Sequence, residues 1–142
     1  MTSSLSVLLV EDDAAHAEIT RRNIEELDRG LRSFVHVKDG QAALDHLDAV
    51  RSTGALPDLI LLDLRLPRLD GLEVLSRVKG DKELKHIPVV VLTTSEAPQD
   101  VSSAYARGAN SYLVKPLDHS AYRALTRTLS SYWFGLNRVA HS

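Results

Sequence analysis

Acidic, hydroxyl and basic side chains stand where four short apolar runs of the chain end. Glu11 and Asp12 follow the first run, Asp63 the third, Thr93 the fourth and Lys115 the last. If the runs are parallel strands, their carboxyl ends meet at one edge of a sheet, where open α/β sheets bind their ligands. We therefore expect these five side chains to lie together.

Three carboxylates and one lysine at a single edge leave an excess of negative charge. A hard divalent cation cancels this charge, and an all-oxygen site with few protein ligands suits Mg²⁺, which retains several waters. A phosphoryl group is the next partner that such a site favours. The cation and Lys115 neutralise its oxygens, and the Thr93 hydroxyl can donate to one of them.

Five apolar runs alternate with segments of helical periodicity. Runs that are apolar throughout indicate a parallel sheet covered on both faces, and right-handed crossovers then give a doubly wound open sheet. The sequence therefore predicts an α/β fold, a doubly wound five-stranded parallel sheet of (βα)5 type. The predicted strands are 5–10, 34–37, 59–62, 89–92 and 111–114, and the predicted helices are 13–29, 41–50, 72–78, 98–107 and a final one capped by Asp118.

The composition excludes several classes of protein. The chain has 142 residues, a mass of 15.7 kDa and a net charge of -2, which is the size of one domain and argues against a protein that coats nucleic acid or an anionic membrane. It has no cysteine, so disulfides and thiolate chemistry are excluded. The apolar runs are far shorter than the roughly 18 residues that span a bilayer. We expect a cytoplasmic protein without a signal peptide.

The motifs at the predicted strand ends resemble those of the receiver domain of two-component response regulators. The resemblance covers about residues 5 to 130. Each motif alone is weak, but their occurrence in order, each at a predicted strand end, is very specific. The motifs are Glu11-Asp12, Asp63-Leu64-Arg65-Leu66-Pro67 with Asp70-Gly71 following, Thr93-Thr94 and Lys115-Pro116. The resemblance implies a flavodoxin-like strand order of 2-1-3-4-5.

The resemblance also implies a role for each residue of the metal site. Asp63 matches the phosphoacceptor and is one of the metal ligands. Asp12 matches the direct Mg²⁺ ligand, Glu11 holds the metal through water, and the backbone carbonyl of Arg65 is the third protein ligand. An arginine two residues after the phosphoacceptor is a less usual choice.

Three further residues match the family's phosphoryl-binding and switching positions. Thr93 and Lys115 would bind phosphoryl oxygens and, with Asp63, form the catalytic set. Tyr112, three residues before the lysine, matches the rotating aromatic that switches together with the threonine. The resemblance implies a signalling switch that catalyses only its own phosphorylation from a donor and its own dephosphorylation.

Simpler interpretations stand beside these roles. Asp13 reads as the first residue of a helix, where it stabilises the macrodipole and does not bind metal. Thr93 alone would be a strand-end hydroxyl, Tyr112 a half-buried strand aromatic and Arg65 a solvated loop charge. The six histidines are scattered and read as surface residues.

Three other functions use similar patterns. A haloacid-dehalogenase-type phosphatase needs a second acid two residues after its nucleophile, and that position is Arg65. A flavodoxin-like cofactor carrier lacks support, because the acidic residues after the first strand would repel a phosphate. A degenerate receiver that serves only as a binding module is disfavoured by the complete set of site residues.

The end of the chain is aromatic, which predicts residues 1–131 as the receiver domain and 132–142 as a C-terminal extension of its last helix. Tyr132-Trp133-Phe134, with Leu136 and Val139 following, would either fold back on the domain or form an interface. This aromatic end and the Leu-Thr-Thr-Ser stretch are similar to the single-domain receivers that serve bacterial phytochrome histidine kinases.

These features predict the partners. A sensor histidine kinase is the expected phosphoryl donor, with a bacteriophytochrome as the narrower expectation, and neither nucleic acid nor a membrane is an expected direct partner. We also expect a homodimer through the face formed by the helix 98–107, the strand 111–114 and the final helix. The side chains predicted to line this face are Tyr105, Arg107, Tyr122, Arg123 and Arg127.

Overall fold

All five apolar runs form one parallel β-sheet in the computed structural model, which describes residues 5–27 and 31–138. The strand order is β2-β1-β3-β4-β5, so the predicted fold class and strand order are confirmed. The strands are β1 Ser6–Val10, β2 Ser33–Val37, β3 Leu59–Leu62, β4 Val89–Thr93 and β5 Ser111–Val114. The helices are α1 Ala14–Leu27, α2 Gly40–Val50, α3 Gly71–Lys79, α4 Pro98–Ala106, α5 His119–Ser130 and the π-helical turn η1 Ser131–Leu136.

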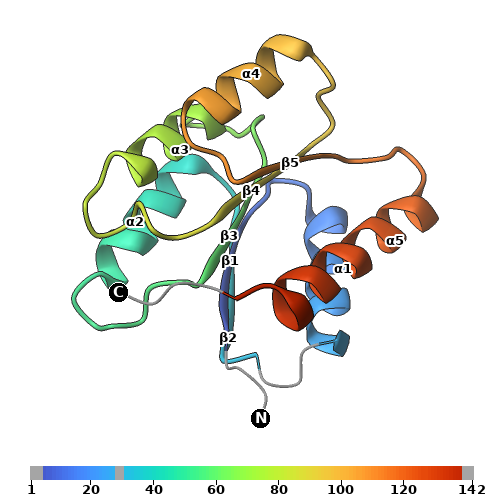
Figure 1. Cartoon of the computed structure of the whole chain (residues 1–142), viewed down its shortest axis with the longest axis horizontal. Helices are drawn as coiled ribbons and strands as arrows, with labels where there is room; N and C mark the ends of the chain where they lie inside the picture. Colours follow the sequence, from blue (N-terminus) through green and yellow to red (C-terminus); the bar gives the residue numbers. More distant parts are fainter. Residues whose placement is uncertain (1–4, 28–30, 139–142) are drawn as a thin grey trace.

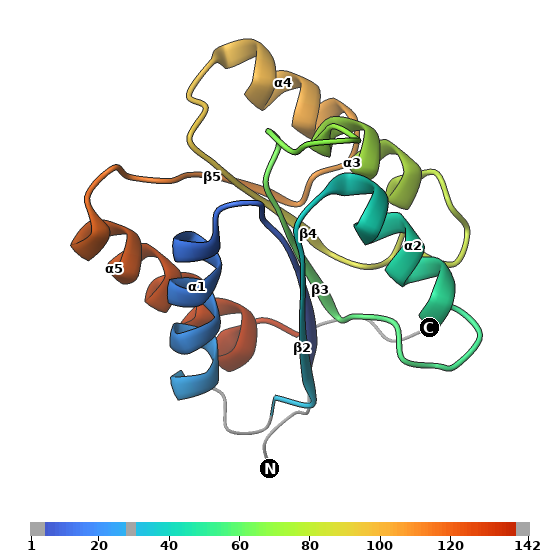
Figure 2. The ribbon, with the colours of Figure 1, turned by 180° about the vertical axis from the view of Figure 1, so that it is seen from behind.

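Helices cover both faces of the sheet. In Figure 1 and in the reverse view of Figure 2, α1 and α5 lie side by side on one face, and α2, α3 and α4 cover the other. Alternate residues of β1 enter different cores: Leu8 and Val10 pack beneath α2 and α3, whereas Val7 and Leu9 pack beneath α1 and α5. A strand buried on both faces has no polar alternation, which explains why the central runs read as apolar throughout.

The helix starts agree with the sequence to within a residue or two. Asp118 caps α5 by accepting a hydrogen bond from the Ala121 N–H at 2.9 Å, as predicted. Asp39 caps α2 in the same way. The predicted end of the first helix at Arg29 lies outside the described residues. No helix in the described ranges has both the length and the apolar character to cross a membrane.

The aromatic end of the chain partly packs on its own domain. Trp133 and Phe134 lie against the core beneath α1 and α5, whereas Tyr132 and Leu136 are exposed. Val139 lies outside the described residues. The division of the chain at residue 131 stays a prediction.

Gly71 fixes the loop that carries Asp63 against the start of α3. A Cβ on Gly71 would overlap the Asp63 carbonyl oxygen and the Leu64 backbone. We therefore expect Gly71→Ala to lower the free energy of unfolding by about 2 kcal/mol, because the loop must shift. Urea unfolding measures this. Gly135→Ala is the control, since nothing lies within 4 Å of its added Cβ; equal losses in both variants would contradict the explanation.

Candidate functional site

Three carboxylates gather at the carboxyl edge of the sheet, as the sequence predicts. Glu11 and Asp12 follow β1, and Asp63 follows β3; each offers an oxygen within 4.8 Å of the others. The strands β1 and β3 are paired with Val10 opposite Leu62, which places the residues after them side by side. Glu11 and Asp63 are buried, whereas Asp12 is exposed.

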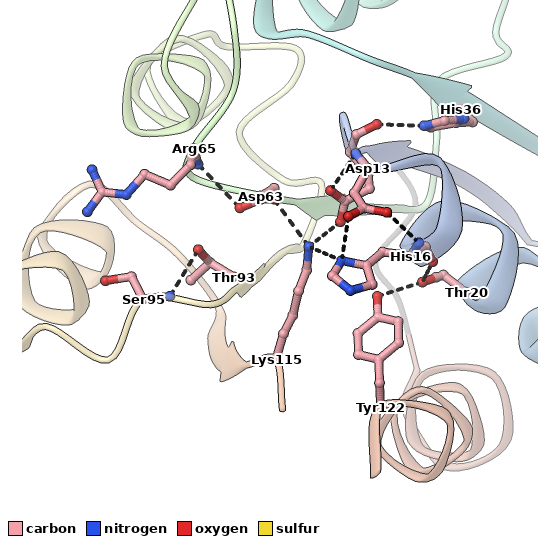
Figure 3. A network of polar contacts seen from close by, with 11 residues as sticks. Asp13, His16, Thr20, His36, Asp63, Arg65, Thr93, Ser95, Lys115 and Tyr122 are labelled. Atoms are coloured by element: carbon pink, nitrogen blue, oxygen red, sulfur yellow. Dashed lines mark hydrogen bonds and ion pairs between the residues drawn. The ribbon is translucent and has the colours of Figure 1, made fainter. Parts of the chain in front are cut away.

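Lys115 extends from the end of β5 into this acidic cluster. Its Nζ donates to Glu11 Oε1 and, at 3.2 Å, to Asp63 Oδ2, and its side chain is 2% exposed. Its backbone N–H donates to the Thr93 carbonyl at 2.7 Å, which aligns the ends of β5 and β4. Figure 3 shows the ammonium pointing toward Asp63 and the end of β1. A buried lysine thus neutralises part of the acidic charge.

The buried position of Glu11 disfavours its charged form. Burial raises the pKa of Glu11 to about 7, while its ion pair with Lys115 acts in the opposite direction and the nearby charge of Asp63 adds to the rise. Two buried carboxylates and one ammonium therefore do not balance by themselves. The site has more negative charge than the protein alone stabilises, which is the condition under which a cation binds.

Arg65 contributes its backbone to the site and directs its side chain elsewhere. Its N–H donates to Asp63 Oδ1 at 3.2 Å, whereas its guanidinium pairs with Asp100, in the first turn of α4, at 2.7 Å. The side chain is two-thirds exposed, as expected for a solvated loop charge, but it also forms an ion pair with Asp100. The predicted role of the Arg65 carbonyl as a metal ligand stays a prediction.

Thr93 and Tyr112 meet through the loop between β4 and α4. The Ser95 N–H donates to Thr93 Oγ1 at 3.4 Å, and the Tyr112 hydroxyl donates to the Ser95 carbonyl at 2.9 Å. The Ser95 hydroxyl also donates to Asp100, the partner of Arg65. The predicted phosphoryl-binding threonine and switch tyrosine are thus connected through a single residue, Ser95.

Two histidines lie at the site, although the sequence predicted only surface positions. His16 Nδ1 is 3.3 Å from Lys115 Nζ, and His36 Nε2 is 2.7 Å from the Glu11 carbonyl oxygen. The signal for His16 was its position just after the Glu11-Asp12 pair, at the start of a helix that begins beside the site. Nothing in the local sequence marked His36, which arrives through the pairing of β2 with β1.

Asp13 precedes the first helix, so the prediction that it is the first helical residue is wrong by one position. The helix α1 begins at Ala14, and Asp13 Oδ1 accepts a hydrogen bond from the His16 N–H at 3.0 Å. This hydrogen bond, more than any other contact, lowers the pKa of Asp13. Asp13 thus caps α1. The expectation that it does not bind metal stays a prediction.

Tyr122 is buried, so the prediction that it lines an exposed contact face is wrong. It is 1% exposed, its ring lies 4.8 Å from that of His16, and its hydroxyl shares a hydrogen bond with Thr20 Oγ1 at 2.8 Å. Tyr122, Thr126 and Leu129 form the buried stripe of α5. Burial therefore raises the pKa of Tyr122.

Comparisons with known proteins agree with this geometry. The family model of the response regulator receiver domain matches residues 7–127. The chain is 46% identical over 134 residues to the probable methanogenesis regulatory protein FilR2 of Methanothrix harundinacea, a match that covers 93% of this chain and 85% of the relative. It is 37% identical over 131 residues to the response regulator Rcp1 of Synechocystis, covering 89% and 87%.

Solved structures show the same similarity. The Mn²⁺-bound form of Rcp1 superposes with a TM-score of 0.90 and covers 96% of this chain and 99% of its own. The phosphorylated cyanobacterial phytochrome response regulator RcpA is 32% identical, with a TM-score of 0.92 and coverage of 98% and 100%.

Proposed function

The chain belongs to the response regulator receiver family, whose members are phosphorylation-dependent signalling switches, and from this we propose that Asp63 accepts a phosphoryl group in a Mg²⁺-dependent reaction. The observation that carries the proposal is the buried ammonium of Lys115 between the carboxylates of Glu11 and Asp63. An acidic site that keeps a buried cation beside one carboxylate is suited to an anion bonded to that carboxylate.

The donor set fits Mg²⁺. Asp12 and Asp63 would bind the ion directly, Glu11 would bind it through water, and the Arg65 carbonyl would complete the protein ligands. All of these are hard oxygen donors, and Asp12 is exposed at the open side of the cluster. When bound, the ion would neutralise charge on the entering phosphoryl group.

The chain's own residues supply the rest of the transfer. An oxygen of Asp63 attacks phosphorus, so that an O–P bond forms while the N–P bond of a donor phosphohistidine breaks and its electron pair returns to the imidazole nitrogen. Lys115 and Thr93 bind phosphoryl oxygens. Hydrolysis removes the phosphoryl group from Asp63. Water attacks phosphorus, and the Asp63 carboxylate leaves with the O–P electron pair. The proton of the water passes to phosphate or solvent.

The conformational change that follows phosphorylation would be transmitted through the loop between β4 and α4. Thr93 Oγ1 accepts the Ser95 N–H in this structure, and a phosphoryl group would draw the threonine toward Asp63. The Ser95 carbonyl holds the Tyr112 hydroxyl. A shift of Ser95 therefore changes the position of Tyr112 and of the first turn of α4, which Ser95 contacts through Asp100.

Acetyl phosphate with Mg²⁺ tests the proposal. The protein should gain about 80 Da, the mass of one phosphoryl group, and lose it again on standing. A protein that gains no mass from acetyl phosphate or from any phosphorylated histidine kinase would instead support the second candidate, a receiver used only as a binding module. The phosphatase alternative lacks its acid, because the position two residues after Asp63 is Arg65.

A sensor histidine kinase of the phytochrome type is the proposed donor, and the cytoplasm, where such a donor would meet it, is the proposed location. The support is the similarity to RcpA, which is described as a cyanobacterial phytochrome response regulator. Phosphotransfer from a panel of purified histidine kinases, followed over seconds to minutes, tests the pairing. Preferential transfer from a kinase without a phytochrome sensor would contradict it.

The phosphorylated protein is proposed to form a homodimer through the face of α4, β5 and α5. Tyr105 is 50% exposed and Val114 37% exposed on this face, and Leu136 adds an exposed apolar side chain. Because Tyr122 is buried, the aromatic contribution of the face rests on Tyr105 and on Tyr132, which is 49% exposed.

Light scattering at tens of micromolar tests this dimer. The phosphorylated chain should have twice the monomer mass of 15.7 kDa. Tyr105→Glu should shift it toward the monomer, because a charge in the contact must be desolvated, whereas Asp45→Arg on the exposed face of α2 should not. Point variants are preferable to truncation after Ser131, since Trp133 packs on the core. A phosphorylated wild type that remains a monomer would exclude the dimer.

A further inference from the structure

We propose that His16 is a positioning residue for Lys115: it accepts one ammonium hydrogen and holds the amine in place for transfer of the phosphoryl group. The inference rests on the proposed function of Asp63. It starts from one contact, the 3.3 Å separation between His16 Nδ1 and Lys115 Nζ, which links α1 to the end of β5 across the site.

The hydrogen bonds of the ammonium fix the role of the imidazole. A lysine ammonium has three hydrogens to donate and cannot accept. Within residues 5–27 and 31–138, three acceptors contact it: Glu11 Oε1, Asp63 Oδ2 and His16 Nδ1. His16 Nδ1 must therefore accept, so the imidazole is neutral and carries its hydrogen on Nε2. Each donor of Lys115 then has a separate partner.

The imidazole is held in this orientation by its surroundings. Its ring packs against the ring of Tyr122 at 4.8 Å, and the Tyr122 hydroxyl bonds Thr20, which in turn donates to the His16 carbonyl at 2.8 Å. Asp13 caps the helix by accepting the His16 N–H. Figure 3 shows the ring between Lys115 and Tyr122. Only a fifth of the His16 side chain is exposed, so its position is built into the packing of α1 against α5.

A neutral acceptor suits the change that phosphorylation requires. Lys115 must leave the carboxylate oxygen of Asp63 and reach an oxygen of the phosphoryl group. Glu11 is at the same time proposed to serve the metal. His16 alone of the three acceptors has neither of these tasks. It keeps one hydrogen bond to the amine throughout, and it adds no negative charge that would compete with the phosphoryl group.

Protonation of His16 would reverse its effect. Burial, and next the charge of Lys115, lower its pKa, while Asp13 and Asp63 act in the opposite direction and His119 adds to the fall. The uncharged hydroxyl of Tyr122 also lies near the ring. Glu11, whose pKa is raised to about 7, shares the ammonium with His16 and titrates in the same way in the wild type and in His16→Asn. The neutral imidazole therefore predominates at neutral pH. As pH falls through this pKa, Nδ1 gains a hydrogen, loses its ability to accept and places a second cation beside the ammonium.

Two variants of His16 separate positioning from packing. His16→Asn keeps an acceptor close to the position of Nδ1 and does not titrate, whereas His16→Leu fills a similar volume without an acceptor. His46→Leu on α2, on the other face of the sheet, is the control. The measurement is the initial rate of Asp63 phosphorylation by acetyl phosphate with saturating Mg²⁺, from about pH 5.5 to 8.

The expected result at pH 8 is a loss of about tenfold in rate for His16→Leu, with His16→Asn and His46→Leu within about twofold of wild type. Toward pH 5.5 the ratio of wild-type to His16→Asn rates should fall, because only the wild type loses its acceptor. Equal rates for wild type and His16→Leu would overturn the inference. Equal losses in the two His16 variants, or parallel pH profiles for wild type and His16→Asn, would also overturn it by showing a packing role.

A second measurement does not depend on phosphorylation. The imidazole nitrogen signals of His16 in the ¹⁵N-labelled protein at pH 8 should show hydrogen on Nε2 and none on Nδ1. The opposite tautomer would overturn the inference even if all rates agreed. A wild type that is not phosphorylated while His16 shows the expected tautomer would refute the proposed function and leave the contact with Lys115 established as structural only.

Discussion

Asp63→Asn is expected to abolish phosphorylation and to leave the fold intact. An amide has nearly the shape of the carboxylate but is a far poorer nucleophile, so the attack on phosphorus fails. Asp63 and Glu11 are both buried, and the charge of Asp63 contributes to the raised pKa of Glu11. Removing that charge relieves repulsion, and the new amide oxygen can still accept from Lys115. Stability should therefore be equal or higher.

Mass spectrometry after treatment with acetyl phosphate and Mg²⁺ measures the effect. Wild type and the control Asp45→Asn, which changes an exposed aspartate of α2, should each gain about 80 Da. The Asp63→Asn protein should gain nothing, with an unchanged circular dichroism spectrum. Phosphorylation of Asp63→Asn at the wild-type level would show that another residue is the acceptor.

The parts of the site that could be predicted from sequence follow from the geometry of parallel strands. Glu11, Asp63 and Lys115 are far apart in the chain, yet each directly follows a strand of the sheet. The carboxyl ends of parallel strands meet at one edge, so the position of each residue in its own βα unit was enough to place them together. The same reasoning identified Thr93, and the one-residue error at Asp13 lies within the usual uncertainty of a helix end.

The errors arose where a side chain's partner lies on another element. Tyr122 was assigned to a contact surface because it stands beside Arg123 on α5 and because a mix of tyrosines and arginines suits an interface. The sequence does not say which stripe of α5 faces α1. In the structure Tyr122 meets Thr20, 102 residues earlier. Periodicity identifies a helix and its apolar stripe, but a tyrosine suits both a core and an interface because its hydroxyl needs only one partner.

Contacts around the acidic cluster were missed for the same reason. His16 meets Lys115 across 99 residues, and Arg65 meets Asp100 across 35. Neither pair forms a motif, because one partner follows a strand and the other lies in the first turn of a helix from a distant segment. The residues proposed to bind the phosphoryl group stand at strand ends, whereas His16 and Asp100 come from helices packed beside those ends.

Asp12→Asn is expected to weaken Mg²⁺ binding more than Glu11→Gln. Asp12 is exposed at the mouth of the cluster, whereas Glu11 is 2% exposed and already engaged by Lys115 and by the Asp13 N–H at 3.1 Å. A direct ligand contributes its full charge at contact distance, and a residue that acts through water contributes less. We expect a loss of at least about a hundredfold in affinity for Asp12→Asn and about tenfold for Glu11→Gln.

Isothermal titration of the unphosphorylated protein with MgCl₂ measures both affinities. Both substitutions keep the shape of the side chain, so a loss of affinity reports charge and coordination and not a cavity. Asp13→Asn is the matched control for charge alone, because Asp13 adjoins the pair but caps α1; its affinity should stay within about threefold of wild type. Equal losses for Asp12→Asn and Asp13→Asn would mean that the cluster attracts the ion only through its field. Equal losses for Asp12→Asn and Glu11→Gln would mean that the buried glutamate turns toward the ion and binds it directly, which would require Lys115 to give up its closest partner when Mg²⁺ enters.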